Sequence, residues 1–280
     1  MNYEQALANA TIILKSASIK SSKLDCEILL SNVLKINREK MLVNLNKKIN
    51  HQDFINFNKL INRRVKNEPV AYIVGYKEFW NKKFKVNSDV LIPRPDTEIL
   101  VEEVIKFTKI NSSLNILDIG TGTGCVLLSV LNERKKCYGT GLDISKKAII
   151  VAKHNAKIQQ LENRIRFINS NIDKFCNGKY DIIISNPPYI KTLSIKKLDD
   201  DVRLYEPKLA LDGGYDGFFQ IREVIKKSSI LIKKKGKLFL EIGFNQVNET
   251  NKLLLDNKFY VNKIVKDLGK KNRCIISTKK

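Results

Sequence analysis

Two short motifs in this sequence combine residue types that could perform chemistry together. The first is Asn-Pro-Pro-Tyr at 186–189, which directly follows the apolar run Ile182–Ile184. The nitrogen of an amide or an exocyclic amine is planar and a poor nucleophile, so an enzyme that methylates it must hold that nitrogen in line with the donor. An Asn side-chain oxygen and a Pro carbonyl oxygen can each accept one N–H and stabilise the positive charge that develops in the transition state. The motif therefore indicates methyl transfer to a planar nitrogen.

Each residue of this motif has an expected role. The side-chain oxygen of Asn186 and the carbonyl of Pro187 would orient the NH2 group, and the two prolines restrict the backbone that presents this carbonyl. The ring of Tyr189 can pack on the flat acceptor group. The transfer can be direct, so no Ser, His or Cys nucleophile is required. We predict Asn186, Pro187 and Tyr189 as catalytic residues, and Asn186, Pro187, Pro188 and Tyr189 as the substrate-binding residues.

The second motif is a glycine-rich turn at 118–124, after a strand candidate. Glycines there let the backbone turn sharply and let a ligand approach the main chain, and the next helix presents its N-terminal amides to the same space. Asp143, at the end of the following strand, can accept both ribose hydroxyls of a nucleotide. A nicotinamide cofactor or S-adenosylmethionine could use such a site. The spacing Gly-x-Gly-x-Gly, with Asp118 two residues before the first Gly, favours S-adenosylmethionine, as does the Asn-Pro-Pro-Tyr motif downstream.

A third segment, after the next strand candidate, lies where the adenine of such a ligand would rest. Asn171 could contact the adenine amino group, and Ile172 could cover the face of the ring. An ordinary loop would account for these two residues equally well.

The elements that must position these motifs alternate between strand and helix. Strand candidates lie at 115–119, 137–142, 165–168, 181–185, 237–242, 259–264 and 274–278, and helix candidates at 126–131, 146–158, 218–231 and 246–255. A further helix is expected to start near Thr97 with Asp96 as its cap. This alternation predicts a mostly parallel sheet covered on both faces. The turn between the last two strands is too short for a crossover, so these strands are expected to pair antiparallel.

The N-terminal part of the chain follows a different pattern. Apolar residues recur every three or four positions through 1–75, which is the period of amphipathic helices, and neither Gly nor Pro interrupts them before Pro69. Between 72 and 90 the pattern changes, and Phe79 and Phe84 predict a hairpin with its turn near 81–82. We therefore predict a helical domain at 1–75, a hairpin linker at 76–90 and a catalytic domain at 91–280.

Composition restricts the class of protein. The net charge of +22 suggests a nucleic-acid partner, but the excess is mostly Lys spread along the chain with abundant Ile and Asn, as AT-rich codons would produce on any surface. Direct nucleic-acid binding is therefore not required. No run of 18 apolar residues occurs and the first residues resemble no signal sequence, so we expect no membrane span and a cytoplasmic location. The five cysteines are scattered, and His51 and His154 lie far apart, which predicts reduced, buried thiols and no metal site.

Segments that flank the two motifs carry a family resemblance. Upstream they are Pro69–Gly75, Glu78–Trp80 and Leu91–Glu98, and downstream they are Asp201–Arg203, Glu206–Pro207, Ala210–Leu211, Gly213–Gly214 and Asp216–Gly217. With these segments the chain resembles, over nearly its full length, the PrmC/HemK family of peptide chain release factor N5-glutamine methyltransferases. The resemblance implies a Rossmann-like, seven-stranded methyltransferase domain of the α/β class, with a small N-terminal helical bundle and a linking β-hairpin.

The resemblance also implies a substrate and a set of contacts. The substrate would be the Gln of the Gly-Gly-Gln motif in class 1 peptide chain release factors, held by 186–189, and the helical domain would dock the release factor. The family often has Asp-Trp where this chain has Asn171 and Ile172. Asn171 keeps an acceptor oxygen, and Ile172 keeps an apolar cover for the adenine but cannot stack a ring on it. The implied contacts to S-adenosylmethionine are Gly120, Thr121, Gly122, Thr123, Gly124, Asp143 and Asn186.

Two alternatives stay open on the sequence. An adenine N6 methyltransferase of DNA or RNA could hold an adenine amino group in the same Asn-Pro-Pro-Tyr motif after extracting the base from its stack. The missing base-recognition domain and the N-terminal helical domain argue against it. The other alternative is a methyltransferase fold that binds partners without turnover, and the intact Gly120, Asp143, Asn186 and Tyr189 argue against such decay.

Overall fold

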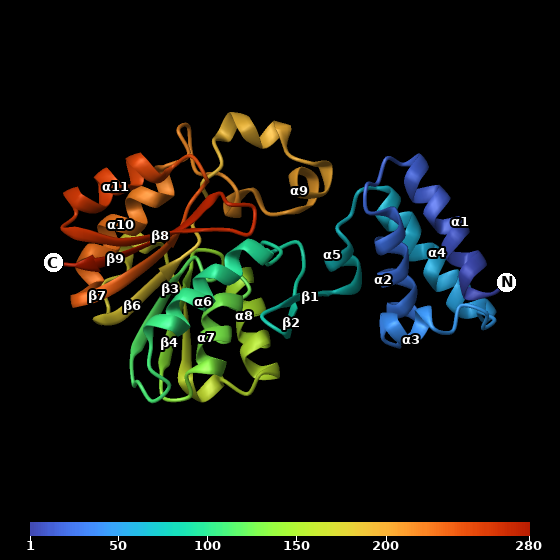
Figure 1. Ribbon diagram of the computed structural model, residues 1–280, viewed down its shortest axis with the longest axis horizontal. Helices are drawn as coiled ribbons and strands as arrows, with labels where there is room; N and C mark the ends of the chain where they lie inside the picture. Colours follow the sequence, from blue (N-terminus) through green and yellow to red (C-terminus); the bar gives the residue numbers. More distant parts are fainter. The chain divides into compact units, whose positions relative to one another are not determined.

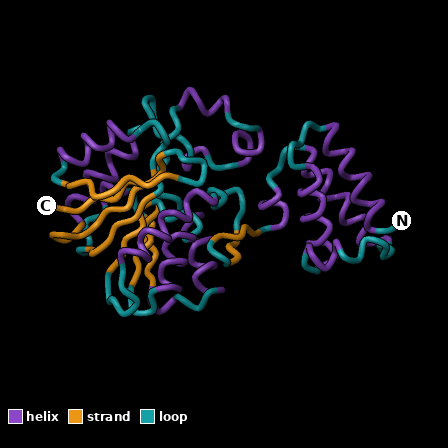
Figure 2. Tube along the Cα trace, viewed as in Figure 1, coloured by secondary structure: helices purple, strands orange, loops and turns teal.

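The computed structural model describes every residue from Met1 to Lys280, and the chain forms two compact units (Figures 1 and 2). The helical unit contains Met1–Tyr76 together with Asp199–Tyr205, and the sheet unit contains Lys77–Leu198 and Glu206–Lys280. The division that the sequence predicts, at 75 and 90, differs from this one mainly at Asp199–Tyr205, which it assigns to the catalytic domain.

The helical unit consists of short helices around an apolar core. The helices are α1 (Tyr3–Ser16), α2 (Ser22–Leu34), α3 (Arg38–Leu42), α4 (His51–Val65), α5 (Val70–Val74) and α9 (Asp200–Tyr205). The side chains of Leu14, Leu29 and Phe57 are fully buried in this core. The absence of Gly and Pro does not prevent breaks between these helices, because Ser18 and Lys35 adopt left-handed backbone angles, with φ of 60° and 54°.

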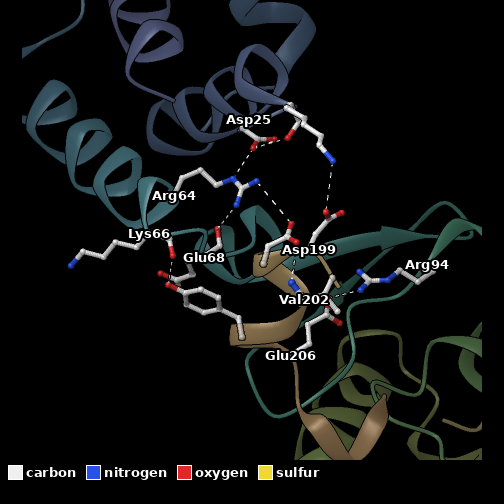
Figure 3. A network of polar contacts seen from close by, with 12 residues as sticks. Asp25, Arg64, Lys66, Glu68, Arg94, Asp199, Val202 and Glu206 are labelled. Carbon is white, nitrogen blue, oxygen red and sulfur yellow. Dashed lines mark hydrogen bonds and ion pairs between the residues drawn. The ribbon is translucent and has the colours of Figure 1, made fainter. Parts of the chain in front are cut away.

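A buried ion pair joins α2 to α4 in the helical unit (Figure 3). Nε of Arg64 lies 2.7 Å from Oδ2 of Asp25, and each side chain is 7% exposed. The guanidinium also lies 4.0 Å from the carboxylate of Asp201 in α9. The hydroxyl of Tyr205, at the end of α9, donates to the carbonyl oxygen of Lys66 at 2.7 Å. Polar contacts to residues far away in sequence therefore attach α9 to the helical unit.

The sheet unit contains a seven-stranded sheet in the order β5-β4-β3-β6-β7-β9-β8. Its strands are β3 (Asn115–Ile119), β4 (Tyr138–Asp143), β5 (Ile165–Asn169), β6 (Tyr180–Ser185), β7 (Ile232–Glu241), β8 (Phe259–Lys266) and β9 (Asn272–Lys279). The first five pair in parallel, and β9 pairs antiparallel with both β7 and β8. The predicted fold class and the antiparallel final hairpin are confirmed.

Helices cover both faces of this sheet (Figure 1). One face packs against α6 (Glu98–Phe107), α7 (Cys125–Glu133) and α8 (Lys146–Ile158), and the other against α10 (Phe219–Leu231) and α11 (Val247–Asp256). Along β6, Ile182 and Ile184 enter the first apolar core and Ile183 enters the second. A strand that is buried on both faces needs such a continuous apolar run. Short 3₁₀ helices complete the unit: η1 (Pro95–Thr97), η2 (Glu162–Arg164), η3 (Ile172–Lys174), η4 (Thr192–Lys197) and η5 (Lys208–Ala210).

Local details differ from the sequence-based expectations at two places. The hairpin of β1 (Tyr76–Phe79) and β2 (Lys82–Lys85) turns at Trp80 and Asn81, both at positive φ, one residue earlier than expected. Asp96 lies inside η1, and the residue that precedes α6 is Thr97, so Asp96 is not the cap of that helix.

Two other expectations concern the cysteines and the possibility of a membrane-spanning helix. Cys176 is exposed, whereas the other four cysteines are buried, so the expectation of buried thiols was wrong for Cys176. None of the helices has both the length and the apolar character needed to cross a membrane.

The ion pair of Arg64 makes a testable contribution to stability. Replacing Arg64 by Met leaves the Asp25 carboxylate buried without its partner, so we expect a loss of about 3–5 kcal/mol in the free energy of unfolding. Urea denaturation followed by circular dichroism would measure it. Arg63→Met is the matched control, because the ion pair of Arg63 with Glu68 leaves the Arg63 side chain 44% exposed and should contribute no more than about 1 kcal/mol. Equal losses in the two variants would contradict the assignment.

Candidate active site

The predicted functional motifs meet at the carboxyl edge of the parallel strands. Ile119 at the end of β3 lies opposite Leu142 of β4 on one side and Ser185 of β6 on the other. The chain proceeds from β3 to β4 and β5 in one direction along the sheet, and β6 and β7 lie in the other direction. Loops diverge where the strand order reverses, and this leaves a crevice in which such sheets bind ligands.

A cavity of about 260 Å³ occupies this crevice. The loops after β3, β4, β5 and β6 contribute to its lining, together with residues before η1, in η5 and in α10. Most of the predicted site residues line it, namely Gly120, Gly122, Asp143, Asn171, Ile172, Asn186, Pro187 and Pro188. Thr121, Thr123, Gly124 and Tyr189 are not among the lining residues, and the contacts predicted for them stay predictions.

The glycine-rich loop has the backbone shape that its sequence suggests. Gly120 and Gly122 adopt φ of +75° and +55°, which side chains other than that of glycine rarely allow. A Cβ atom placed on Gly120 would meet no other atom within 4 Å, so the backbone there faces open space beside the cavity. A ligand can therefore approach the main chain directly.

Asp143 ties the loop after β4 to the loop after β3. Its Oδ2 accepts a hydrogen bond from the backbone N–H of Gly122 at 2.9 Å, and its Oδ1 accepts one from the N–H of Ser145 at 2.9 Å. Burial raises the pKa of this carboxyl group, and the two backbone N–H groups counteract the increase. Each oxygen accepts one hydrogen bond and can accept another, and Asp143 lines the cavity, which suits the two hydroxyls of a ribose.

Asp118 and Thr121 support the same loop from beneath. The hydroxyl of Thr121 donates to Oδ2 of Asp118 at 2.7 Å, and both side chains are buried. Burial raises the pKa of Asp118 to about 7, the Thr121 hydrogen bond lowers it, and the charge of Asp143 raises it. The hydroxyl of Thr121 is therefore engaged by Asp118, and the ligand contact predicted for Thr121 stays a prediction.

The acceptor motif begins where β6 ends. Asn186 lines the cavity, and its Nδ2 donates to Oγ1 of the buried Thr97 at 3.2 Å. This bond directs Nδ2 toward Thr97 and leaves Oδ1 as the free acceptor. Pro187 is buried and lines the same cavity. The two predicted acceptor groups therefore belong to the wall of one cavity, together with the glycine-rich loop.

Tyr189 points away from this wall. Its ring packs against the apolar core beneath α10 and α11, and its hydroxyl donates to Oε1 of Glu241 at 3.4 Å. Burial and the Glu241 charge raise the pKa of the Tyr189 hydroxyl. Stacking of this ring on the acceptor group stays a prediction. The sequence analysis missed Glu241, which lies at the end of β7 and is 2% exposed.

An ion pair joins two segments that stood out in the sequence. The guanidinium of Arg94 binds the carboxylate of Glu206, and the N–H of Ile92 donates to the same carboxylate at 3.2 Å (Figure 3). Leu91 and the neighbouring Pro207 both line the cavity. The pair therefore holds two walls of the cavity together, a role that neither segment reveals alone.

Close backbone packing braces the acceptor loop from behind. A Cβ atom on Gly213 would lie 2.8 Å from Cα of Tyr189, and one on Gly217 would lie 2.7 Å from the carbonyl oxygen of Tyr189. The side-chain Nε2 of Gln246 donates to the carbonyl oxygens of Gly217 at 2.9 Å and Tyr189 at 3.3 Å. Glycine is required at 213 and 217 because the two loops touch main chain to main chain.

The cavity differs in charge from the rest of the chain. The chain carries a net charge of +22, but the cavity lining contains the carboxylates of Asp89, Asp143, Asp173 and Glu223 and no Lys, Arg or His. A crevice lined by one sign of charge attracts ligands of the other sign. The site therefore favours a cationic ligand over a phosphate group.

Comparisons with known proteins agree with these features. The N-terminal region matches the family model of the PrmC N-terminal domain at residues 5–75, and residues 95–200 match that of the methyltransferase small domain. The chain is 40% identical over 271 residues to the release factor glutamine methyltransferase of Fusobacterium nucleatum, an alignment that covers 95% of this chain and 76% of the relative. It is 34% identical to the release factor glutamine methyltransferase of Caulobacter vibrioides, over 95% of this chain and 92% of the relative.

Other relatives are longer or more distant. The bifunctional methyltransferase of Rickettsia prowazekii is 38% identical, and the alignment covers 97% of this chain but only 56% of that protein. Among solved structures, a methyltransferase from Pyrococcus furiosus is similar with a TM-score of 0.55 and 17% identity, over 78% of this chain and 96% of that one. At this low identity the similarity shows the fold alone.

The raised pKa of Asp118 predicts how stability depends on pH. The Asp118 carboxyl group is neutral below about pH 7 in the folded chain but ionises near its ordinary pKa of 3.8 when exposed. Its contribution to stability is therefore fully present below pH 3.8 and is lost as pH rises to about 7. Asp118→Asn cannot ionise and keeps an acceptor for Thr121. We expect the melting temperature of this variant, relative to wild type, to be higher at pH 8 than at pH 5.

Thermal denaturation at pH 5 and pH 8 measures the melting temperature of the variant minus that of the wild type. The other titrating groups are the same in both proteins, so their effects cancel in this difference. Asp256→Asn removes an exposed carboxylate at the end of α11 and serves as the control, for which we expect no such change. A difference between Asp118→Asn and wild type that is the same at both pH values would contradict the raised pKa.

Proposed function

We propose that this chain, which belongs to the family of release factor glutamine methyltransferases, methylates the side-chain amide nitrogen of the Gln in the Gly-Gly-Gln motif of class 1 release factors. One observation carries the proposal. Asn186 lines the same cavity as Asp143 and the glycine-rich loop, and the bond from its Nδ2 to Thr97 leaves Oδ1 available as an acceptor. Donor and acceptor groups can therefore meet without any movement of the strands.

The cofactor is S-adenosylmethionine, and the residues of the cavity fit it. Asp143 would hold the ribose hydroxyls, Gly120 and Gly122 would let the main chain approach, and Asn171 and Ile172 would lie beside the adenine. The carboxylates of the lining suit the positive charges of the sulfonium and the amino group. When bound, this cofactor supplies an electrophilic methyl group, and the C–S bond breaks as the N–C bond forms.

The acceptor residues have separate tasks in this reaction. Oδ1 of Asn186 and the carbonyl oxygen of Pro187 each accept one N–H of the substrate amide, which orients the nitrogen toward the methyl group. Both acceptors stabilise the positive charge that develops on that nitrogen before its proton leaves. Pro187 and Pro188 keep the backbone in place, so little reorganisation is needed during the transfer.

The charge of the cavity argues against the adenine alternative. A nucleic-acid substrate brings phosphate groups close to the reacting base, and proteins normally meet them with Lys or Arg. The cavity lining contains neither residue, despite the basic composition of the chain. Substantial methylation of protein-free DNA or RNA would revive this alternative.

The helical unit would dock the release factor, since a cavity for one side chain cannot select a whole protein. The match of residues 5–75 to the PrmC N-terminal domain supports this role. The site of action would be the cytoplasm, where release factors act. Undiminished affinity for a release factor after deletion of residues 1–75 would argue against docking by this unit.

Mass spectrometry of candidate release factors, after incubation with the chain and S-adenosylmethionine, tests the proposed reaction. We expect a mass increase of one methyl group on the Gly-Gly-Gln peptide. Asn186→Ala removes one aimed acceptor, which should cost on the order of 3 kcal/mol of transition-state stabilisation, or about a hundredfold in rate, with a smaller effect on cofactor affinity.

Asn163→Ala is the matched control, because Asn163 is exposed in η2 and does not line the cavity. It should methylate at the wild-type rate. An unchanged rate in Asn186→Ala would refute the role of Asn186, and the absence of methylation on every release factor tested would refute the substrate.

A further inference from the structure

A buried amide side chain binds the main chain of the acceptor loop. Gln246 directly precedes α11 and is 5% exposed. Its Oε1 accepts a hydrogen bond from the N–H of Gly243 at 2.8 Å, and its Nε2 donates to the carbonyl oxygens of Gly217 at 2.9 Å and Tyr189 at 3.3 Å. A backbone N–H can only donate and a carbonyl oxygen can only accept, so these partners fix which end of the amide is the oxygen.

The three partners of this amide belong to three different parts of the sheet unit. Gly243 follows β7, Tyr189 ends the acceptor motif, and Gly217 lies just before α10. Phe219, the first residue of α10, lines the cavity. The Gln246 side chain therefore connects the acceptor loop both to the end of a central strand and to a helix that forms part of the cavity wall.

The acceptor loop needs such a contact because of its own sequence. Pro187 and Pro188 have no N–H, so their main chain cannot donate a hydrogen bond that would hold the loop in place. The next carbonyl oxygen, that of Tyr189, packs against the main chain at Gly217, where a Cβ atom would lie 2.7 Å from it. The NH2 group of Gln246 gives each of these two residues a donor for its carbonyl oxygen. Loss of that group would leave both oxygens without this donor, at a place where the packing leaves little room for a substitute.

We propose that Gln246 is a positioning residue, which holds the acceptor loop so that the carbonyl oxygen of Pro187 meets the substrate amide. This inference rests on the proposed methyl transfer to an amide nitrogen. Gln246 is not among the residues that line the cavity, so it acts through the loop. Its partners lie outside the loops after β3, β4 and β5, so the cofactor should bind almost as well without it. A displacement of about 1 Å near the reacting atoms can lower a rate by about a hundredfold, so even a partial release of the loop should be visible in kcat.

The variant Gln246→Glu can be switched by pH. A neutral carboxyl group keeps one donor for a carbonyl oxygen and one acceptor for the N–H of Gly243, whereas a carboxylate can only accept. Burial raises the pKa of carboxyl groups, and it raises those of Asp118 and Glu241 to about 7. We therefore expect the kcat of Gln246→Glu, relative to wild type, to fall by about tenfold between pH 5 and pH 8, the worth of one well-placed hydrogen bond. The KM for S-adenosylmethionine should change by less than about twofold.

The charged groups on the surrounding elements do not account for such a change. They are present in the wild type and in the variant, so their titration cancels in the ratio of the two rates. These groups are Lys191 beside Gly217, the ion pair of Asp216 with Arg222, Glu241 at the end of β7 and Glu249 in the first turn of α11.

A second variant and a matched control separate positioning from general damage. Gln246→Met removes both polar groups at a similar volume and should lower kcat by about tenfold at both pH values. Asn257→Asp is the control: Asn257 lies at the other end of α11, does not line the cavity, and donates from Nδ2 to the carbonyl oxygen of Leu253 at 2.8 Å. It makes the same change from amide to acid, and its kcat relative to wild type should be equal at pH 5 and pH 8. If Gln246→Met fails to fold, the Glu variant at the two pH values carries the test.

Another readout needs no substrate. Pro188 and Tyr189 form the only Pro-Tyr pair in the sequence, so ¹³C-labelled Pro with ¹⁵N-labelled Tyr gives one coupled carbonyl signal in NMR spectra, and this signal comes from the acceptor loop. We expect it to move in Gln246→Met, to move between pH 5 and pH 8 in Gln246→Glu by more than in wild type, and to stay in place in Asn257→Asp.

The possible failures of the two proposals differ. A wild-type chain that methylates no release factor would refute the proposed function. An unmoved carbonyl signal in Gln246→Met, or a wild-type kcat in Gln246→Glu at pH 8, would overturn the positioning role alone. A kcat of Gln246→Glu that is equally low at both pH values would indicate general damage and would overturn that role as well.

Discussion

Parallel hydrogen bonding between β3 and β6 aligns Ile119 with Ser185, and the arrangement of the site depends on this pairing. The glycine-rich loop leaves one strand and the Asn-Pro-Pro-Tyr loop leaves its neighbour at the same edge of the sheet. A shift of one residue in this register would turn every side chain of β6 to the opposite face, so Ile182 and Ile184 would leave the first core and Ile183 would leave the second. The packing of the two cores therefore fixes the register that brings the donor and acceptor loops to one edge of the sheet.

Charge is distributed in this protein by location. A surface rich in Lys surrounds a cavity lined by carboxylates, and two further acids, Asp118 and Glu241, are buried behind the donor and acceptor loops. Burial raises the pKa of both to about 7. Asp118 accepts a hydrogen bond from the hydroxyl of Thr121, and Glu241 accepts one from the hydroxyl of Tyr189. Burying each acid is unfavourable, but Asp118 binds a residue of the glycine-rich loop and Glu241 binds a residue of the acceptor loop.

The segment between β6 and α10 contributes to both units. Its part at Asp199–Tyr205 belongs to the helical unit through contacts with Arg64, Lys66 and Lys20, and the next residue, Glu206, returns to the sheet unit to bind Arg94 beside the cavity. The sheet-unit part of this segment contributes Pro207, Leu209 and Ala210 to the cavity wall.

The sequence alone determined the strands and helices of the sheet unit, the antiparallel final hairpin, and the motifs at Gly120, Asp143 and Asn186, because periodicity, glycine and the spacing between strands act locally. It did not determine that Thr121 serves Asp118, that Tyr189 points to Glu241, or that Arg94 pairs with Glu206, which lies 112 positions away. Only the tertiary structure decided these contacts, since each joins side chains whose separation depends on how strands and loops pack, and a buried polar group takes whichever partner that packing places beside it.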